Sequence, residues 1–377
     1  MRRPTADAAL AVSALLIVTG CSGGSPSEGP APSSSRAGAP TAPAGSARGS
    51  AEVVATLATG LTSPWGVAPL PGGDLLVGSR DTGTVVRVAA VGGRRTPLGT
   101  VPDVAAAGEG GLLGLAASPR YATDHLLYAY VTTGSDNRIV RMPVDEGAPE
   151  GRRLGTPEVV LRGIPKGTVH NGGRIAFGPD GMLYAGTGES GRRDLAQDRA
   201  SLGGKILRLT PEGRPAPGNP DPGSVVYSYG HRNVQGLAWD AERRLWASEF
   251  GQDTWDELNL VEPGGNYGWP QAEGTAHRAG LKDPVVQWRT TDASPSGLAY
   301  AAGSLWMAGL RGERLWRIPL RGSAAAAGPR AFLHGNYGRL RTVVPVGDDG
   351  LWLTTSNTDG RGSPAAGDDR LLRLKVT

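Results

Sequence analysis

The chain has 377 residues and a formal net charge of +4, with acidic and basic residues interspersed along its length. It has no basic block of the kind that follows a phosphate backbone, which argues against nucleic-acid binding. A single cysteine excludes an internal disulfide.

The first 21 residues have the features of a secretory signal. Arg2 and Arg3 precede a short apolar run, residues 8–18, and small residues follow in "VTGCSGG". Cys21 stands where the cysteine of a bacterial lipobox would stand. We therefore expect an exported protein that meets the membrane only through a lipid anchor on the extracellular side. A plain signal peptide with an incidental cysteine is the alternative.

Residues 22–50 are almost entirely Ser, Gly, Pro and Ala. Such a composition cannot bury enough apolar surface to offset the entropy of ordering the chain. We expect this segment to be a flexible linker between the anchor and a single domain that spans residues 51–377.

The expected domain repeats one phrase six times: a turn, a short apolar strand, a polar loop and a second short strand. The copies begin at Gly72, Thr123, Pro179, Glu242, Ala302 and Asp348. A spacing of roughly 45–60 residues and strand-like runs bounded by Gly, Asp and Pro are typical of propeller blades. The sequence therefore predicts an all-β fold, a six-bladed β-propeller. We expect a strand near Val53–Thr56 to close the ring beside the C-terminal "RLLRLKV".

The stretch "HNGGRIAFGPDGMLYAGTGESG" contains Gly186-x-Gly188-x-x-Gly191, which matches the dinucleotide-binding fingerprint. The residues that follow, "RRDLAQDRASLGG", lack a good apolar stripe, and the next element reads as another short strand. Without a βαβ unit the fingerprint carries no weight. These glycines are more typical of a wide turn between two strands than of a nicotinamide site.

His170 lies in the same stretch, before what reads as the outer strand of a blade. Gly172 and Gly173 beside it would let a ligand approach the backbone closely. A neutral histidine is the usual base for removing a hydroxyl proton near pH 7. A turn histidine that only hydrogen-bonds the backbone is the alternative.

Arginines recur in the polar loops of separate blades. Arg232 and Asn233 lie in "YGHRN", and Arg311 lies in "GLRGER". Arg339 and Arg341 flank a leucine in "YGRLRTV", so strand alternation puts both on one face. Together these side chains suggest a ligand with several carboxylates, which guanidinium groups bind well. Singly, each could be an ordinary solvated arginine.

Residues 248–270, "SEFGQDTWDELNLVEPGGNYGWP", form the densest stretch of oxygen ligands. Carboxylates at Glu249, Asp253, Asp256 and Glu257 sit among glycines that expose backbone carbonyls. Calcium takes several such oxygens, although an acidic surface turn has the same composition. The sequence shows no zinc-spaced Cys/His cluster, nucleophile elbow or P-loop.

The phrases that carry these residues resemble a known family. In order they are "TSPWGVA", "GEGGLLGLAASPRY", "HNGGRIAFGPDGMLYAGTGE", "GGKILRL", "YGHRNVQGLAWD", "EFGQDTWDELNLVEPGGNYGWP" and "GRLRTV". They run as in the soluble glucose/sorbosone and aldose sugar dehydrogenases that depend on pyrroloquinoline quinone (PQQ). The resemblance covers residues from about 55 to 375. That family is a six-bladed propeller, in agreement with the repeats.

The resemblance implies that an aldose is oxidised and that electrons pass from PQQ to an external acceptor. His170 matches the base that takes the hydroxyl proton while hydride leaves the anomeric carbon for the quinone. Arg232 matches a residue that contacts the quinone oxygens and stabilises charge there. The implied cofactor contacts are Glu109, Arg232, Asn233, Arg311, Arg339 and Arg341.

The resemblance also implies two calcium sites. The backbone carbonyls of Gly251 and Gln252 match those that hold the calcium bridging to PQQ. Glu257 and Tyr267 match ligands of a second, structural calcium.

Departures from the glucose-oxidising branch lie near the sugar and the metals. Glu109 stands where many members have glutamine, and Asp194 replaces a substrate-contacting glutamine. Val169 replaces an aspartate, so His170 is expected to lack that neighbouring carboxylate to orient it. The sequence "QAEGTAH" after Pro270 lacks much of the second calcium loop. The shorter, more general aldose dehydrogenase branch fits better.

Two other functions are compatible with the same fold. One is a non-catalytic propeller that binds a carbohydrate or a protein on the cell surface. The position of four side chains distinguishes it from the dehydrogenase, which requires them to meet at one end of the propeller: His170, Arg232, Arg339 and Arg341. The other is a propeller lactonase, which would need a metal held mainly by side chains on the axis.

Overall fold

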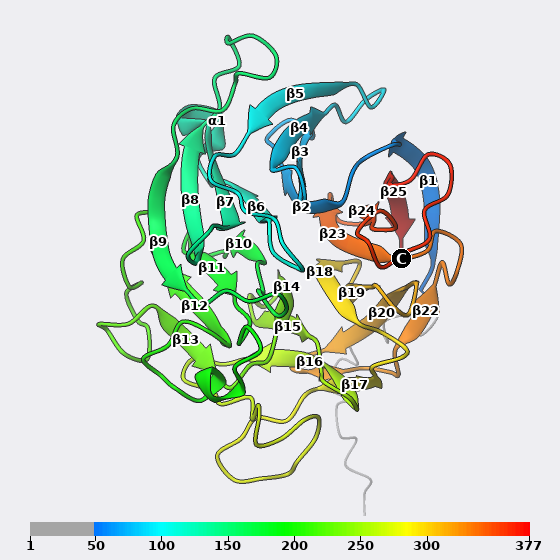
Figure 1. Cartoon of the computed structure of the whole chain (residues 1–377). Coiled ribbons are helices and arrows are strands. Elements are labelled where there is room, and N and C mark those ends of the chain that lie inside the picture. The colour runs from blue at the N-terminus through cyan, green and yellow to red at the C-terminus, as the bar shows by residue number, and fades with distance from the viewer. Residues whose placement is uncertain (1–48) are drawn as a thin grey trace, which may run out of the picture. The chain divides into compact units, whose positions relative to one another are not determined.

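A computed structural model describes residues 49–377, so the predicted signal, Cys21 and most of the linker lie outside the described residues. In this range six antiparallel sheets are arranged in a ring, which confirms the six-bladed β-propeller (Figure 1). Among residues 49–377, regular helix is limited to α1 (Tyr121–Asp124) and the 3₁₀ turn η1 (Arg193–Ala196). Neither these nor any other helix within residues 49–377 has the length and apolar character needed to span a bilayer.

We number the blades in chain order. Blade 1 contains β2 (Pro64–Pro69), β3 (Leu75–Ser79), β4 (Thr84–Val88) and β5 (Arg95–Thr100). Blade 2 contains β6 (Leu112–Ala117), β7 (Leu126–Thr132), β8 (Asn137–Pro143) and β9 (Glu158–Ile164). Blade 3 contains β10 (Ile175–Phe177), β11 (Leu183–Gly186), β12 (Lys205–Leu209) and β13 (Val226–Tyr229).

The second half of the ring continues the pattern. Blade 4 contains β14 (Val234–Trp239), β15 (Leu245–Glu249), β16 (Trp255–Val261) and β17 (Val286–Arg289). Blade 5 contains β18 (Pro295–Ala301), β19 (Ser304–Gly309), β20 (Arg314–Arg321), β21 (Ala324–Ala325) and β22 (Arg330–Phe332). Blade 6 contains β23 (Leu340–Val346), β24 (Gly350–Thr355), β25 (Leu371–Val376) and β1 (Ala51–Ala58).

The ring closes inside blade 6, where segments from both ends of the described chain pair. Strand β1 runs antiparallel to β25, with Val53 opposite Leu374 and Thr56 opposite Leu372. This confirms the predicted closure. Strand β1 is the outermost strand of blade 6, so an N-terminal segment supplies the outer edge of the sheet that the C-terminal strands begin.

The first strand of each blade lies nearest the axis, and neighbouring first strands contact one another: β2 with β6, β6 with β10, β14 with β18 and β18 with β23 (Figure 1). His170 therefore precedes the innermost strand of blade 3, and its placement before an outer strand was wrong. The apolar run of β10 is only three residues long. Such a short run resembles an edge strand in sequence, although it is flanked by other blades.

Glycines mark the points where inner strands approach most closely. A Cβ at Gly114 in β6 would lie 2.2 Å from the carbonyl oxygen of Gly173, and one at Gly236 in β14 would lie 2.5 Å from that of Ser296. Gly66 and Gly297 face backbone atoms of the next blade in the same way. Only a residue without a side chain fits these contacts.

Large apolar side chains fill the space between blades farther from the axis. Trp246, Trp306 and Trp352 lie on the second strands of blades 4, 5 and 6 and are fully buried. The indole N–H of Trp246 donates to Asp240 at 2.8 Å, so the ring is buried without an unsatisfied donor. Each such ring stabilises the packing of adjacent blades by roughly 2–3 kcal/mol.

Substitution Gly114→Ala tests the close approach of the inner strands. The added methyl would meet a backbone carbonyl that cannot rotate away, so we expect a loss of about 1–3 kcal/mol of stability. Thermal unfolding followed by circular dichroism measures it. The matched control is Gly134→Ala, where nothing lies within 4 Å of the added atom. Equal melting temperatures for the two variants would contradict this packing model.

Candidate active site

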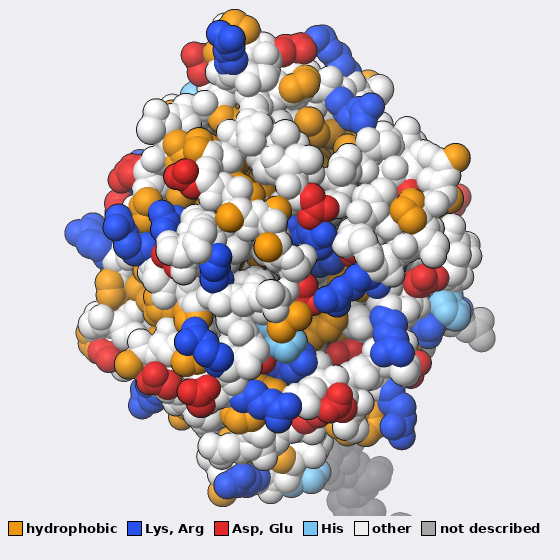
Figure 2. Space-filling view, viewed as in Figure 1, with side chains coloured by type: hydrophobic (Ala, Val, Ile, Leu, Met, Phe, Trp, Pro, Cys, Tyr) orange, Lys and Arg blue, Asp and Glu red, His pale blue; other side chains and the backbone are white. Residues whose placement is uncertain are grey.

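One cavity of about 450 Å³ lies at the end of the ring where the inner strands begin. It is lined by loops that precede the inner strands and by loops that follow the second strands. Basic side chains, acids and a histidine gather around this central hollow (Figure 2). Of the predicted site residues, those that line it are Glu109, His170, Arg232, Asn233, Gly251, Gln252, Arg311, Arg339 and Arg341.

The His170 ring is held by a buried carboxylate. Its Nδ1 lies 2.7 Å from Oε1 of Glu189, whose side chain is 1% exposed. His170 lacks a carboxylate at position 169, as expected, but Glu189 from the loop after β11 orients the ring instead. An ionised carboxylate only accepts, so Nδ1 carries the hydrogen and Nε2 keeps its lone pair.

The His170 backbone is fixed in the left-handed region, with φ of 54°. Its N–H donates to Oε2 of Glu109 at 2.8 Å, and its carbonyl accepts from the N–H of Ser190 at 3.0 Å. A Cβ at Gly188 would lie 2.0 Å from that carbonyl, so the two loops fit only with glycine there. A rare conformation that several contacts enforce is typical of a functional position.

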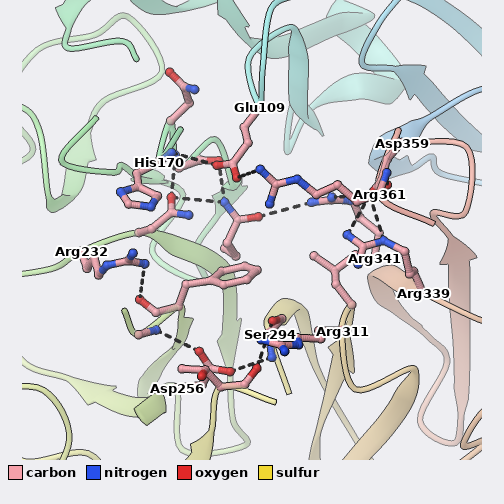
Figure 3. A pocket seen from close by; sticks show the side chains of 18 of the residues that line it. Glu109, His170, Arg232, Asp256, Ser294, Arg311, Arg339, Arg341, Asp359 and Arg361 are labelled. Carbon is pink, nitrogen blue, oxygen red and sulfur yellow. Dashed lines mark hydrogen bonds and ion pairs between the residues drawn. The ribbon is translucent and has the colours of Figure 1, made fainter. Parts of the chain in front are cut away.

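Glu109 also links two sides of the cavity mouth. Its Oε1 pairs at 2.8 Å with Arg361, which comes from the loop between β24 and β25 (Figure 3). Arg361 is 61% exposed. An exposed pair of this kind adds little stability, but it sets which groups border the entrance.

Arg339 and Arg341 are oriented by one buried carboxylate. Oδ2 of Asp359 accepts from Nη2 of Arg339 at 3.0 Å, from Nη2 of Arg341 at 3.2 Å and from the Ser356 hydroxyl at 2.9 Å. Although burial opposes it, the two guanidinium groups lower the pKa of Asp359 to about 2. Burial lowers the pKa of Arg341 to about 10.

The cavity lining has more cations than anions. Six arginines face three carboxylates: Arg80, Arg232, Arg311, Arg339, Arg341 and Arg361 against Glu109, Asp256 and Asp359. Guanidinium groups bind planar carboxylates in forked geometry. The lining is therefore suited to a ligand that carries several negative charges.

Arg232 is positioned by a chain of buried hydrogen bonds. Its backbone N–H donates to Oε1 of Glu249, whose Oε2 accepts from Nδ1 of His231 at 2.7 Å. The Ser228 hydroxyl lies 2.8 Å from Nε2 of His231. These three side chains are almost completely buried and do not line the cavity. The Arg232 guanidinium lies 5.4 Å from the ring centroid of Trp269, and burial lowers the pKa of Arg232.

The loop after β15 turns five successive amides toward two carboxylates. Gly251 donates to Oδ1 of Asp256 at 2.9 Å. The N–H groups of residues 252–255 all donate to Oε1 of Glu273, at 2.7–3.0 Å. Burial raises the pKa of Asp256 to about 6, although hydrogen bonds from Gly251 and Ser294 favour its ionised form.

This arrangement directs the carbonyls of Gly251 and Gln252 away from Glu273, since C=O and N–H point in opposite directions across a peptide plane. Among the hydrogen bonds of residues 49–377, none ends on these two carbonyls. A Cβ at Gly251 would lie 1.8 Å from the Trp255 carbonyl, so the turn requires glycine. Two free carbonyls at a cavity wall fit a hard cation such as calcium.

Glu257 and Tyr267 do not line the main cavity. They border a small adjoining cavity together with Glu249 and Glu273. Burial, followed by the charge of Glu249, raises the pKa of Glu257. The Tyr267 hydroxyl donates to the carbonyl of Leu260 in β16 at 2.7 Å, so it is already engaged by the protein. Across residues 49–377, no three His, Cys, Asp or Glu side chains are grouped to hold a metal ion.

Several residues of the site were absent from the sequence prediction. Glu189, Arg80, Asp359 and Arg361 all follow the second strand of a blade. Aligning the repeats on their second strands would have drawn attention to the loops that hold these acids and arginines.

Comparisons with known proteins place the chain in a family. A family model described as Glucose / Sorbosone dehydrogenase matches residues 61–373. The structure of the PQQ-bound aldose sugar dehydrogenase from Streptomyces coelicolor is 70% identical, with a TM-score of 0.87 over 88% of this chain and 99% of that chain. Aldose sugar dehydrogenase YliI of Escherichia coli is 32% identical over 80% of this chain and 89% of its own.

A third relative is more distant. Quinoprotein glucose dehydrogenase B of Acinetobacter calcoaceticus is 30% identical over 63% of this chain and 56% of its own. The family model covers most of the propeller, and the cavity lies inside the matched range. The chain therefore belongs to the glucose/sorbosone dehydrogenase family.

Proposed function

We propose that this protein is a PQQ-dependent dehydrogenase that oxidises an aldose at its anomeric carbon to the lactone. The observation that carries the proposal is the meeting, in one cavity, of the His170–Glu189 pair, an arginine-rich wall and two free carbonyls. The Streptomyces coelicolor relative, with PQQ bound, supports the cofactor. The names of the other relatives support an aldose substrate.

The charges of the lining support PQQ as the ligand. PQQ is a planar quinone with three carboxylates, and the cavity offers a surplus of guanidinium groups. The residues proposed to hold it are Arg232, Asn233, Arg311, Arg339 and Arg341. Glu109 lines the same cavity, but its carboxylate is committed to His170 and Arg361. We therefore assign Glu109 the support of the base rather than direct contact with the cofactor.

His170 is the proposed general base. Nε2 takes the proton of the C1 hydroxyl, and Glu189 stabilises the imidazolium that forms. When bound, PQQ supplies the hydride acceptor, so the C1–H electron pair leaves the sugar as the C1–O double bond forms. Arg232, held from behind by Glu249, places a positive charge where negative charge develops.

We propose that calcium binds at the Gly251 and Gln252 carbonyls. The amides of this loop are already satisfied by Asp256 and Glu273, so the carbonyls are preorganised as oxygen ligands. A second, structural calcium beside Glu257 is a separate proposal. It rests on the buried carboxylates there and would use the Tyr267 carbonyl rather than its hydroxyl.

We propose that the substrate is an aldose of a broader class than glucose alone, and that an external acceptor reoxidises the cofactor. Asp194, where the glucose-oxidising branch has a substrate contact, is exposed in η1 and does not line the described cavity. The binding-only alternative loses its main support, because His170, Arg232, Arg339 and Arg341 meet at one end. The lactonase alternative requires a cage of metal-binding side chains, which residues 49–377 do not contain.

Loss of the base should abolish turnover. We expect His170→Ala to lower kcat by about 100-fold or more, and Glu189→Gln by at least about 10-fold. Dye reduction by protein reconstituted with PQQ and calcium, across a panel of aldoses, measures both. His125→Ala, on an exposed histidine that does not line the cavity, is the control. Full activity of His170→Ala would rule out the proposed base.

Calcium binding by backbone carbonyls predicts that substitutions at Gly251 and Gln252 have different effects on calcium affinity. Gly251→Ala should weaken calcium binding by about 10-fold or more, since its methyl would clash with the Trp255 carbonyl and move the loop. Gln252→Ala keeps its backbone carbonyl and should bind calcium like the wild type. Calorimetric titration of calcium into the PQQ-loaded protein gives both affinities. A loss in Gln252→Ala equal to that in Gly251→Ala would contradict backbone ligation.

Export and lipidation remain proposals, because residues 1–48 lie outside the described range. We propose that Cys21 carries the lipid that anchors the protein outside the cell. Metabolic labelling with a palmitate analogue should mark the wild-type protein and not Cys21→Ser, and the variant should leave the membrane fraction. Membrane association that survives Cys21→Ser would argue for another anchor.

A further inference from the structure

Arg174 is a buried guanidinium directly behind the cavity wall. It precedes β10 and is 7% exposed. Its Nε donates to the Gln235 carbonyl at 2.8 Å, and its Nη2 donates to the Thr342 hydroxyl at 3.0 Å. Its guanidinium carbon lies 4.3 Å from the ring centroid of Trp65. Trp65 and Gln235 both line the cavity, so Arg174 forms the layer behind them.

The groups described around Arg174 leave its charge without a carboxylate. A carbonyl, a hydroxyl and an aromatic ring are its contacts, and all three are neutral. The charged group that acts on it most is Arg341, which repels it. Burial and this repulsion lower the pKa of Arg174 to about 9. Asp359, the acid nearest Arg341, is already shared with Arg339.

Such an arrangement is costly for the ligand-free protein. Removing a charge from water without a counter-ion costs several kcal/mol, and neutral hydrogen bonds recover only part of it. Trp65 lies between two guanidinium groups, since the Arg341 guanidinium is 5.7 Å from the same ring centroid. This side of the cavity is therefore positively charged both in its lining and in the layer behind it.

We propose that Arg174 is a buried counter-charge for the anionic cofactor: it strengthens PQQ binding and raises the reduction potential of bound PQQ, while it does not stabilise the ligand-free fold. The inference rests on the proposed function for the identity of the ligand. Arg174 acts through the cavity wall and not by contact, so it is a positioning residue. In a medium of low polarity its charge still acts on the cavity.

The effect on the potential follows from the sign of the charge. Reduction adds electrons to the quinone, so a fixed positive charge nearby stabilises the reduced form more than the oxidised form. Removing the charge should then lower both the affinity for PQQ and its potential. If Arg174 only packed the wall, its substitution would not lower the PQQ affinity and the potential together.

Two substitutions separate charge from packing. Arg174→Gln keeps a donor for the Gln235 carbonyl and removes the charge. Arg174→Lys keeps the charge but replaces the planar guanidinium with a compact ammonium group. The matched control is Arg317→Gln in β20. Arg317 is also buried and lies 6.0 Å from an indole centroid, that of Trp306, but it does not line or back the cavity.

Three measurements on the full-length protein test the inference. They are the melting temperature without ligand, the PQQ affinity by calorimetry in the presence of calcium, and the midpoint potential of bound PQQ by spectroelectrochemistry. For Arg174→Gln we expect an unchanged or higher melting temperature, a PQQ affinity at least about 10-fold weaker and a lower potential. Arg174→Lys should restore most of the affinity and the potential, and Arg317→Gln should leave both unchanged.

Other results would overturn the inference. An affinity and potential unchanged in Arg174→Gln would show that the charge does not reach the cofactor. A lower melting temperature without ligand, with affinity that Arg174→Lys fails to restore, would assign Arg174 a packing role. If the wild type itself does not bind PQQ, the proposed function fails, and this inference fails with it. Binding by the wild type that Arg174→Gln leaves intact overturns the inference alone.

Discussion

The close approach of the six inner strands is the constraint on which the rest of the structure depends. At Gly114 and Gly236 the next blade's backbone comes so near that a methyl group would not fit. Strands packed this tightly must all begin at the same end of the ring, and the second strands, which run antiparallel to them, must end there. The loops at these points therefore meet around one cavity. This is why His170, Arg232 and Arg341, which lie in three different blades, line the same space.

Around that cavity, acidic residues hold other groups of the protein in place, and arginines supply the positive charge of the lining. Glu189 orients the base, Asp359 holds two guanidinium groups in place, and Glu273 gathers the amides of a loop so that its carbonyls point outward. Each carboxylate is engaged by protein donors, which leaves the net positive charge of the lining for a ligand. Arg174 adds a further positive charge directly behind the cavity wall, and no protein carboxylate is among its described contacts. The carboxylates that line this pocket thus leave part of its positive charge unbalanced.

Much of the architecture could be predicted from repetition. Six turn–strand–loop–strand phrases indicated six blades, and the pairing of β1 with β25 followed from the need to close the ring. Radial order could not be read from the same pattern, because the three-residue β10 looks like an edge strand although it lies at the axis. The recurring glycine in "PWGVA", "LLGLA", "VQGLA" and "PSGLA" marks inner strands, but its meaning depends on contacts between blades.

The site was predicted less completely than the fold. His170 and Arg232, which lie in distinctive phrases, line the cavity as expected, whereas Glu189 was not predicted although it lies in the same stretch as His170. Its role depends on a hydrogen bond across a loop of the ring and not on spacing along the chain. Tyr267 shows a different limit: the resemblance named the residue as a calcium ligand but not the atom, and in the structure its hydroxyl donates to the Leu260 carbonyl.

The closure of blade 6 has a consequence for how the protein is made. A ribosome delivers β1 first and β25 last, so their pairing must wait until almost the whole chain has emerged. Arg339, Arg341 and Asp359 belong to this same blade, which no shorter chain can complete. A chain that ends before blade 6 would therefore lack these three residues of the cavity lining.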